Sequence, residues 1–253
     1  MDLAQVALVG AAALTAGMIN AIAGGGSLVS FPVLLLVGLP AVTASVTNTV
    51  AMCPGYLGAT LAQRRDLVGQ RSRALRVVPA AAIGGIAGGL LLLTTGERAF
   101  GVIVPFLLLF AAGLLAMQER LRRALLAGRQ GKAHSETWAA VPVALAAVYG
   151  GYFGAGMGVI VLAALAVVLD DSLIRVNALK QTVSLVVNVS AAILFLFSGR
   201  IDWTITLVMA FAALAGGAIG GAIASRVSAQ LLRWSVIVVG LGVSAVYFVK
   251  LLR

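Results

Sequence analysis

The stretch Ala23-Gly24-Gly25-Gly26-Ser27 interrupts an apolar segment near the start of the sequence, and Ala155-Gly156-Met157-Gly158-Val159 interrupts another one 132 positions later. Backbone without helical hydrogen bonds is tolerated at membrane depth only where protein buries it or where it lines a cavity. Paired interruptions of this kind in the two halves of a chain indicate the binding site of a transporter. The two glycine breaks therefore predict both the fold class and the place of the site.

The composition of the chain is that of a membrane protein. Hydrophobic residues make up 61% of the 253 positions and charged residues only 10%, whereas a soluble domain is about half apolar and about a quarter charged. Apolar stretches long enough to span a bilayer recur along the chain. Alanine, leucine, valine and glycine dominate them without the alternation of a β-barrel, so we predict an all-α polytopic membrane protein.

We expect about eight transmembrane helices and two shorter ones. The predicted spans are Leu3–Ala23, Ala41–Ala62, Val77–Thr94, Ala99–Met117, Thr137–Tyr152, Val176–Phe197, Trp203–Ile223 and Leu231–Leu251. An apolar piece follows each break, Ser27–Val37 and Val159–Leu169, and each is too short to cross a core of about 30 Å at about 1.5 Å per residue. These two pieces are predicted to be half-membrane helices. The first residues lack the basic region of a cleavable signal peptide, so none is expected.

Glycine motifs recur along the chain at the same offset of 132 residues. The corresponding pairs are Gly24 with Gly156, Gly26 with Gly158, and Gly84, Gly85, Gly88 and Gly89 with Gly216, Gly217, Gly220 and Gly221. Two separate motifs that match without a gap predict an internal duplication.

The chain thus divides into two homologous halves, residues 1–118 and 136–253, joined by a basic linker at 119–135. The halves are parallel if the short helices do not cross the membrane and inverted if they do. The charges outside the two arginine-rich loops are too evenly distributed to decide between these topologies.

The net charge of +10 is concentrated beside predicted spans. One group of basic residues follows the second span and another lies in or beside the linker; they are Arg64, Arg65, Arg71, Arg73 and Arg76, and Arg120, Arg122, Arg123, Arg129 and Lys132. Basic residues in short loops are typical of the cytoplasmic side of a membrane. We therefore interpret both loops as cytoplasmic and expect no nucleic-acid binding; contact with anionic lipid is the alternative.

Each glycine break precedes a short helix, whose unpaired N–H groups and positive dipole end then point into the break. Such a helix start binds anions without a charged side chain. The predicted substrate-binding residues at the breaks are Gly24, Gly25, Gly26 and Ser27 in the first, and Gly156 and Gly158 in the second. The alternative is close helix packing, which small residues favour, and this is our interpretation of the two GGxxGG motifs.

Lys180 lies inside the sixth predicted span. A charge at the centre of a membrane helix costs about 2.5–3.5 kcal/mol on insertion scales, so an intramembrane lysine indicates function, although its long stem also permits it to reach the interface. Its counterpart at the offset of 132 is Asn48. We predict that Lys180 contacts a substrate and that Asn20, Thr47, Asn48 and Asn177 complete the site; interhelical hydrogen bonds are the alternative for these polar residues.

The eight acidic residues lie at predicted span ends or in loops. A carboxylate proton relay within the membrane is therefore not expected, and a positive, donor-rich site without carboxylates favours anions. The sequence has no motif of a zinc site, a nucleophile elbow or a phosphate-binding loop, and Cys53 is its only cysteine. We expect no cofactor, no metal and no enzymatic activity.

These motifs give the chain a specific resemblance to a known family. The stretch AGMINAIAGGGSLVSFPVLLLVGLPAVTASVTN, from Ala16 to Asn48, is similar to the leading motif of the sulfite exporter TauE/SafE family, also called the toluenesulfonate uptake permease family. The second half adds GGYFGAGMG at Gly150–Gly158, NALK at Asn177–Lys180 and GRIDW at Gly199–Trp203, in the order of that family. The resemblance implies an inner-membrane permease with duplicated halves, associated with sulfite, sulfonates and related organic anions.

Together, these features predict a secondary carrier that exports a small sulfur-containing anion, such as sulfite or an organosulfonate. Moving one negative charge outward down an interior-negative potential releases about 2.3 kcal/mol per 100 mV, so export needs no proton relay. An anion-selective channel and a carrier for a non-sulfur organic anion are the alternatives. The particular anion, the direction, the coupling ion and the oligomeric state stay open.

Overall fold

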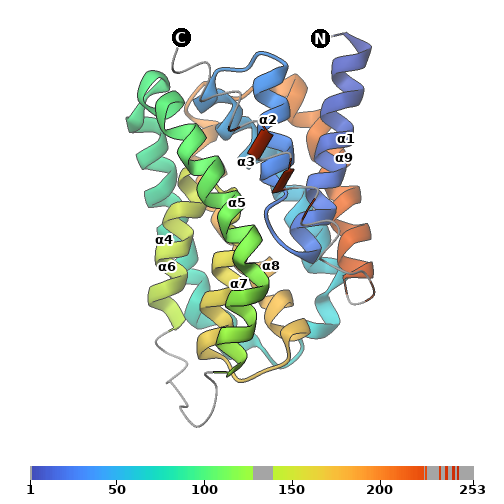
Figure 1. The fold of residues 1–253 in the computed structure, drawn as a ribbon, viewed down its shortest axis with the longest axis vertical. Coiled ribbons are helices and arrows are strands. Elements are labelled where there is room, and N and C mark those ends of the chain that lie inside the picture. The colour runs from blue at the N-terminus through green and yellow to red at the C-terminus, as the bar shows by residue number, and fades with distance from the viewer. Residues whose placement is uncertain are drawn as a thin grey trace.

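A computed structural model describes residues 2–127 and 139–224 and scattered single positions between 226 and 244. These residues form helices and no strand (Figure 1). In chain order the elements are α1 (Leu3–Ile22), α2 (Ser27–Leu36), α3 (Ala41–Ala62), the 3₁₀ helix η1 (Arg64–Leu67), α4 (Arg71–Thr95), α5 (Glu97–Ala127), α6 (Ala140–Tyr152), α7 (Met157–Val168), α8 (Leu173–Leu196) and α9 (Trp203–Ile223). The all-α prediction is confirmed for the described part of the chain.

Five helices of the described ranges are long and apolar enough to cross a membrane: α1, α4, the Glu97–Gln118 part of α5, α8 and α9. The helix α6 has only 13 residues and reaches about 20 Å, which is less than a bilayer core. The helix α3 has 22 residues, but hydroxyl and amide side chains lower its hydropathy. The predicted span Leu231–Leu251 falls almost wholly outside the described residues. A multi-pass membrane architecture is thus confirmed, whereas the count of eight spans is not.

Each break joins the helix before it to a short helix after it, and each pair forms a V-shaped hairpin. Figure 1 shows α1 starting at the end of the bundle where the N-terminus lies and α2 returning toward that end. The helices α6 and α7 form a similar pair that opens at the opposite end, where α5 ends. Neither short helix runs the full length of the bundle, yet the hairpins point in opposite directions. The helix before the first break, α1, is long and apolar enough to cross a membrane, whereas the helix before the second break, α6, has 13 residues.

Glycine is required at the apex of each hairpin because the chain turns there through left-handed backbone. Gly24 and Gly25 have φ angles of 80° and 92°, and Gly154 and Gly156 have φ angles of 78° and 76°. Residues with a Cβ atom rarely adopt these angles. The turns bring the C-terminal end of one helix and the N-terminal end of the next to the same place inside the bundle.

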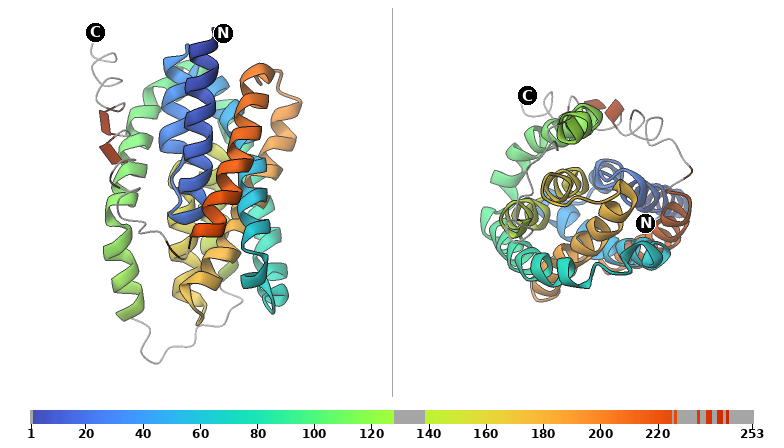
Figure 2. Two further views of the ribbon diagram at one scale, coloured as in Figure 1. Left: turned by 90° about the vertical axis from the view of Figure 1, so that its right-hand side faces the viewer. Right: turned by 90° about the horizontal axis from the view of Figure 1, so that it is seen from below.

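The long helices pack across the predicted halves. The helix α9 packs along α1 and α3, whereas α4 packs along α6 and α8. Figure 2 shows α9 beside α1 over much of its length. Two packed units result, which we call the α9 unit (α1, α3 and α9) and the α4 unit (α4, α6 and α8). Each unit contains one helix from the other predicted half.

The GGxxGG motifs form these contacts. A Cβ atom on Gly85 of α4 would lie 2.7 Å from the carbonyl oxygen of Val187 in α8, and one on Gly217 of α9 would lie 1.9 Å from the carbonyl oxygen of Gly55 in α3. Helix backbones approach this closely only where no side chain separates them, so the packing interpretation of both motifs is confirmed. Gly217 follows Gly85, and Val187 follows Gly55, by the same 132 positions. The contact of α4 with α8 therefore corresponds to the contact of α9 with α3, and in each case the two helices come from different predicted halves.

Candidate functional site

The two glycine breaks touch each other inside the bundle. A Cβ atom on Gly24 would lie 3.0 Å from the Cα atom of Gly158 and 3.1 Å from the backbone nitrogen of Val159. Beside this contact, Phe31 of α2 and Phe153 of the second break pack edge to face, with ring centroids 5.1 Å apart. All five residues are buried. The two predicted sites therefore form one region.

Polar side chains from α1 and α3 hold the N-terminal end of α2. The amide oxygen of Asn20 accepts a hydrogen bond of 2.7 Å from the Gly26 N–H. The Asn48 amide donates to Ser27 Oγ at 3.3 Å and accepts from Ser30 Oγ at 2.6 Å. These bonds fix the start of α2 relative to both neighbouring helices.

Five backbone N–H groups remain as donors at the two breaks. They donate no hydrogen bond to any residue that the structure describes, and they belong to Gly25, Ser27, Ala155, Gly156 and Gly158. Buried N–H groups without a partner are rare in proteins, and the start of a helix carries partial positive charge. These groups are the ones through which the breaks can bind an anion.

Side-chain nitrogens of α8 and α5 donate hydrogen bonds to the C-terminal end of α1. Three residues of α8 and one of α5 donate to its last carbonyl oxygens. The bonds run from Lys180 Nζ to Asn20 O (3.1 Å), from Gln181 Nε2 to Asn20 O (3.1 Å) and Ala21 O (2.7 Å), from Asn177 Nδ2 to Ala21 O (3.2 Å) and from Gln118 Nε2 to Ala23 O (3.1 Å). The helix α8 of the α4 unit, together with α5, thus binds the carbonyl end of α1, which belongs to the α9 unit.

Lys180 is the charged residue of this region. Its side chain is 0% exposed, and a Cβ atom on Gly158 would lie 3.8 Å from its Nζ atom. Among the described residues, the Asn20 carbonyl is the one hydrogen-bond acceptor of Lys180 Nζ. Lys180 forms no ion pair with any of these residues. An ammonium group removed from water is stable when it is paired or fully hydrogen-bonded. Two of its three donors therefore remain for a ligand, and a negatively charged ligand fits best.

The structure brings most of the predicted site residues together. Those at the contact between the breaks, or bonded directly to it, are Asn20, Gly24, Gly25, Gly26, Ser27, Asn48, Gly158 and Lys180. Gly156 lies in the second break and faces α5, where a Cβ atom would lie 3.4 Å from Ala111 Cα. Asn177 binds Ala21 O and Gln63 Oε1, one turn before Lys180. Thr47 lies elsewhere, because its hydroxyl accepts the Asp202 N–H at the start of α9.

The sequence interpretation missed Gln181, Gln118, Gln63 and Ser30. Gln181 is fully buried and follows Lys180 directly, so an uncharged amide beside an intramembrane lysine was an available signal. Ser30 lies one turn after Ser27, where its hydroxyl reaches Asn48. Gln63 and Gln118 stand at span ends, a position typical of solvated residues, and the sequence offers no sign that they face α1.

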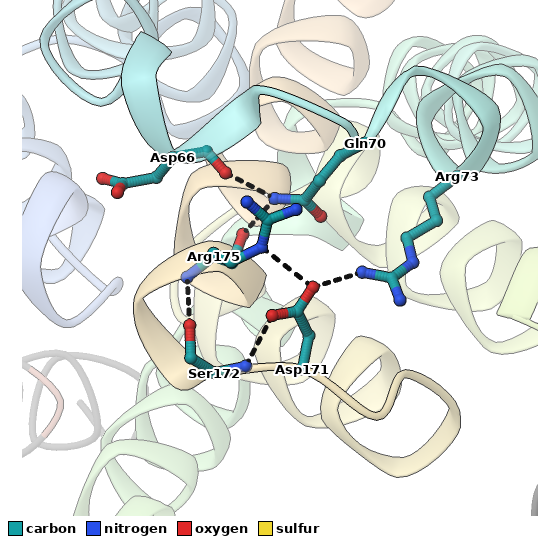
Figure 3. Close-up of polar contacts among 6 residues, drawn as sticks. All are labelled: Asp66, Gln70, Arg73, Asp171, Ser172 and Arg175. Atoms are coloured by element: carbon teal, nitrogen blue, oxygen red, sulfur yellow. Dashed lines mark hydrogen bonds and ion pairs between the residues drawn. The ribbon is translucent and has the colours of Figure 1, made fainter.

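A charged cluster lies at the end of the bundle where α7 meets α8 (Figure 3). Asp171 pairs with Arg73 of α4 and, at 3.0 Å, with Arg175 of α8, and it accepts the Ser172 N–H at 2.7 Å. Partial burial opposes ionisation, but hydrogen bonds from the two arginines hold the pKa of the Asp171 carboxyl below its usual value. Gln70 joins η1 to this cluster by donating to Asp66 O and Arg175 O. The cluster ties the start of α4 to the start of α8.

Within the described ranges, no group of three or more histidine, cysteine, aspartate or glutamate side chains is placed to hold a metal ion. The donor set at the breaks consists of N–H, amide, hydroxyl and ammonium groups, which suits an anion rather than a metal.

Membrane-spanning helices, two broken hairpins that meet inside the bundle, and a buried cation at their contact define a multi-pass membrane transporter. The chain belongs to the sulfite exporter TauE/SafE family, whose model matches residues 9–247. The resemblance seen in the sequence is thereby confirmed.

Curated relatives are described as transporters as well. The chain is 25% identical over 241 residues to the "Probable membrane transporter protein YfcA" of Escherichia coli K12, covering 95% of this chain and 87% of that protein. It is 28% identical over 239 residues to a "Probable membrane transporter protein" of Haemophilus influenzae, covering 91% and 89% of the two chains. It is 24% identical over 233 residues to "Probable membrane transporter protein ORF9" of a Sinorhizobium species, covering 92% and 88%. These descriptions agree on transport across a membrane and name no substrate.

Proposed function

We propose that this protein is a secondary carrier that exports a small sulfur-containing anion, such as sulfite or an organosulfonate, across the inner membrane. The observation that carries the proposal is the fully buried Lys180 ammonium, whose one described acceptor is the Asn20 carbonyl at 3.1 Å. A buried cation with donors to spare is stabilised by a negatively charged partner. The family description supplies the sulfur chemistry of that partner.

The substrate would bind beside the contact between the two breaks. Lys180 supplies the charge, and the unpaired N–H groups of Gly25, Ser27 and Gly158 supply directional donors to the anion oxygens. Asn20 and Asn48 fix the start of α2 around the anion. An oxyanion with three oxygens on one sulfur atom can accept hydrogen bonds from several such donors.

Transport requires that this site open to each side in turn. The close glycine contacts within the α9 unit and within the α4 unit resist separation, because interdigitated backbones cannot slide without clashes. The units pack against each other along α3 and α8, and they also meet at the breaks and through the side-chain bonds from α8 to α1. We therefore assign the motion to the α9 unit against the α4 unit, instead of to the two halves of the sequence.

Orientation follows from the basic residues. The loop with η1 and the start of α4, and the end of α5, lie at the same end of the bundle (Figure 1). Both regions carry the arginine groups found in the sequence, so this end is assigned to the cytoplasm by the positive-inside rule. The recurrence of the GGxxGG contacts at the offset of 132 supports the duplication of the two halves.

The test is a flux assay in proteoliposomes with sulfite and methanesulfonate, under an imposed membrane potential, for wild type, Lys180→Ala and Arg98→Ala. Arg98 is an exposed cation at the start of α5 and serves as the matched control. We expect saturable, potential-driven flux in wild type and Arg98→Ala and its loss in Lys180→Ala. Equal flux in all three proteins would overturn the proposal.

The same assay separates the alternatives. An anion-selective channel would show no saturation at low substrate concentration and no counter-transport of labelled anion. A carrier for a non-sulfur organic anion would be inhibited by carboxylates more strongly than by sulfonates. Inward flux of the anion that requires co-transport of a cation in the same direction would identify the protein as an uptake system.

A further inference from the structure

Two donors meet on one oxygen at the contact between the packed units. The Asn20 carbonyl accepts a hydrogen bond of 3.1 Å from Lys180 Nζ and another of 3.1 Å from Gln181 Nε2. Both donors are 0% exposed, and the carbonyl residue Asn20 is 5% exposed. The two hydrogen bonds leave this oxygen fully satisfied, since a carbonyl oxygen has two lone pairs.

The second donor, Gln181, lowers the free-energy cost of moving Lys180 from the Asn20 carbonyl to a ligand. If Lys180 turned from Asn20 to a bound anion in a protein without Gln181, the carbonyl would stay buried without a partner, which is costly. With Gln181 present, the Asn20 oxygen keeps a donor throughout. The neighbouring Ala21 oxygen, which Gln181 also binds at 2.7 Å, has a further donor in Asn177 at 3.2 Å.

We infer that Gln181 is a positioning residue for anion binding: it holds the Asn20 carbonyl so that Lys180 can exchange this carbonyl for the substrate anion. The inference rests on the proposed function of Lys180. It assigns to Gln181 no contact with the substrate, and it explains why an uncharged amide stands directly beside the buried lysine. Lys180 is then shared between α1 and the ligand, so substrate binding loosens one of the bonds between the α9 unit and the α4 unit.

Gln181→Met is the main variant, because it keeps the length of the side chain and removes its donor. We expect the Kd for methanesulfonate, measured by calorimetry on the full chain in detergent, to rise about tenfold, as one unpaired buried carbonyl predicts. Asn188→Leu is the matched control: it removes a buried amide of the same helix that donates to Ser184 O within α8 and leaves Asn20 O untouched, so its Kd stays within about twofold of wild type. If Gln181→Met does not fold, Gln181→Asn replaces it, because a shorter amide weakens the bond instead of deleting it.

A merely structural role is separated by a double-mutant cycle with Lys180→Met. Our inference requires that adding Gln181→Met to Lys180→Met leaves the residual Kd unchanged. The melting temperature of the double variant should fall by more than the sum of the two single changes, because only there does the Asn20 carbonyl lose both donors. A Gln181→Met protein that binds as tightly as wild type, while Lys180→Met does not bind, would overturn the inference and leave the proposed function standing. Lys180→Met protein that binds like wild type would overturn the proposed function itself.

Discussion

A Cβ atom on Gly24 would lie 3.0 Å from the Cα atom of Gly158, and a Cβ atom on Gly158 would lie 3.0 Å from the Cα atom of Gly24. The two breaks are therefore in backbone contact, and a side chain at either position would clash with the backbone of the other. This reciprocal contact brings the N-terminal ends of α2 and α7 close together, so the partial positive charges of both helix starts act on the same region.

Replacing Gly158 by alanine tests this contact. The added methyl group would force the breaks apart, and overpacking of this kind costs about 1–3 kcal/mol. We expect a lower melting temperature in detergent and a reduced flux. Gly101→Ala is the control, because a Cβ atom on Gly101 meets nothing within 4 Å. Equal melting temperatures for the two variants would show that the breaks do not touch.

Two substitutions of Asn20 separate its structural contact from the charge of the site. Asn20→Leu leaves the buried Gly26 N–H without its 2.7 Å acceptor, so stability falls by about 1–3 kcal/mol. Asn20→Asp retains an acceptor and adds a negative charge beside Lys180, which then needs no further anion. We expect Asn20→Asp to fold but to bind neither sulfite nor methanesulfonate in calorimetry. Wild-type affinity in Asn20→Asp would mean that Lys180 is not the cation that binds substrate.

A disulfide within the α4 unit tests which parts move. A Cβ atom on Gly89 would lie 3.5 Å from the Cβ atom of Ala191, which suits a disulfide. The test protein carries Gly89→Cys and Ala191→Cys together with Cys53→Ser, which removes the native cysteine. We expect the two new cysteines to form a disulfide, and we expect the oxidised and the reduced protein to have the same flux. The pair Gly10→Cys and Val208→Cys makes the same test in the α9 unit, since a Cβ atom on Gly10 would lie 3.6 Å from Val208 Cγ1. Arrest of transport by either disulfide would favour motion of the sequence halves.

The Asp171 cluster gives a pH-dependent prediction. The pKa of Asp171 is lower in the folded protein than its usual value, so the ionised carboxylate stabilises the fold above the pKa of the unfolded state, about 4. This stabilisation is lost as pH falls through the lower folded pKa. Asp171→Asn therefore lowers stability by about 1 kcal/mol at neutral pH, a modest value because the partners are partly exposed.

The measurement is the melting temperature of both proteins between pH 3 and pH 8. The difference between wild type and Asp171→Asn should be constant above pH 5 and shrink below pH 4. A difference that does not change with pH would show that the ionised form of Asp171 adds no stability.

The sequence predicted the breaks better than it predicted the course of the helices. Glycines at 24, 25 and 156 mark turns that only left-handed backbone permits, and this is a local property of the chain. The number of crossings depends instead on where each hairpin turns back, which is decided by packing between α2, α7 and the long helices. Hydropathy does not report that packing, so a full span was predicted where the structure has the 13-residue helix α6.

Within the site, the charged and glycine residues were recognisable and their partners were not. Lys180 is conspicuous because a buried charge is costly, whereas Gln118 and Gln181 are ordinary residues until their contacts with α1 are known. Thr47 was predicted from its place beside Asn48, but adjacent residues on a helix face directions about 100° apart. Its hydroxyl accordingly reaches the start of α9 instead of the break.

The exchange of α4 and α9 between the packed units bears on how such a chain is built. During synthesis, the glycine-facing surfaces of α1 and α3 have no partner until α9, which comes much later in the chain, enters the membrane. A protein consisting of a single repeat would meet the same need by placing its fourth helix in a second copy and receiving that copy's helix in return. Such a subunit would be complete only as a reciprocally swapped pair, and joining two copies in one chain makes that pairing permanent.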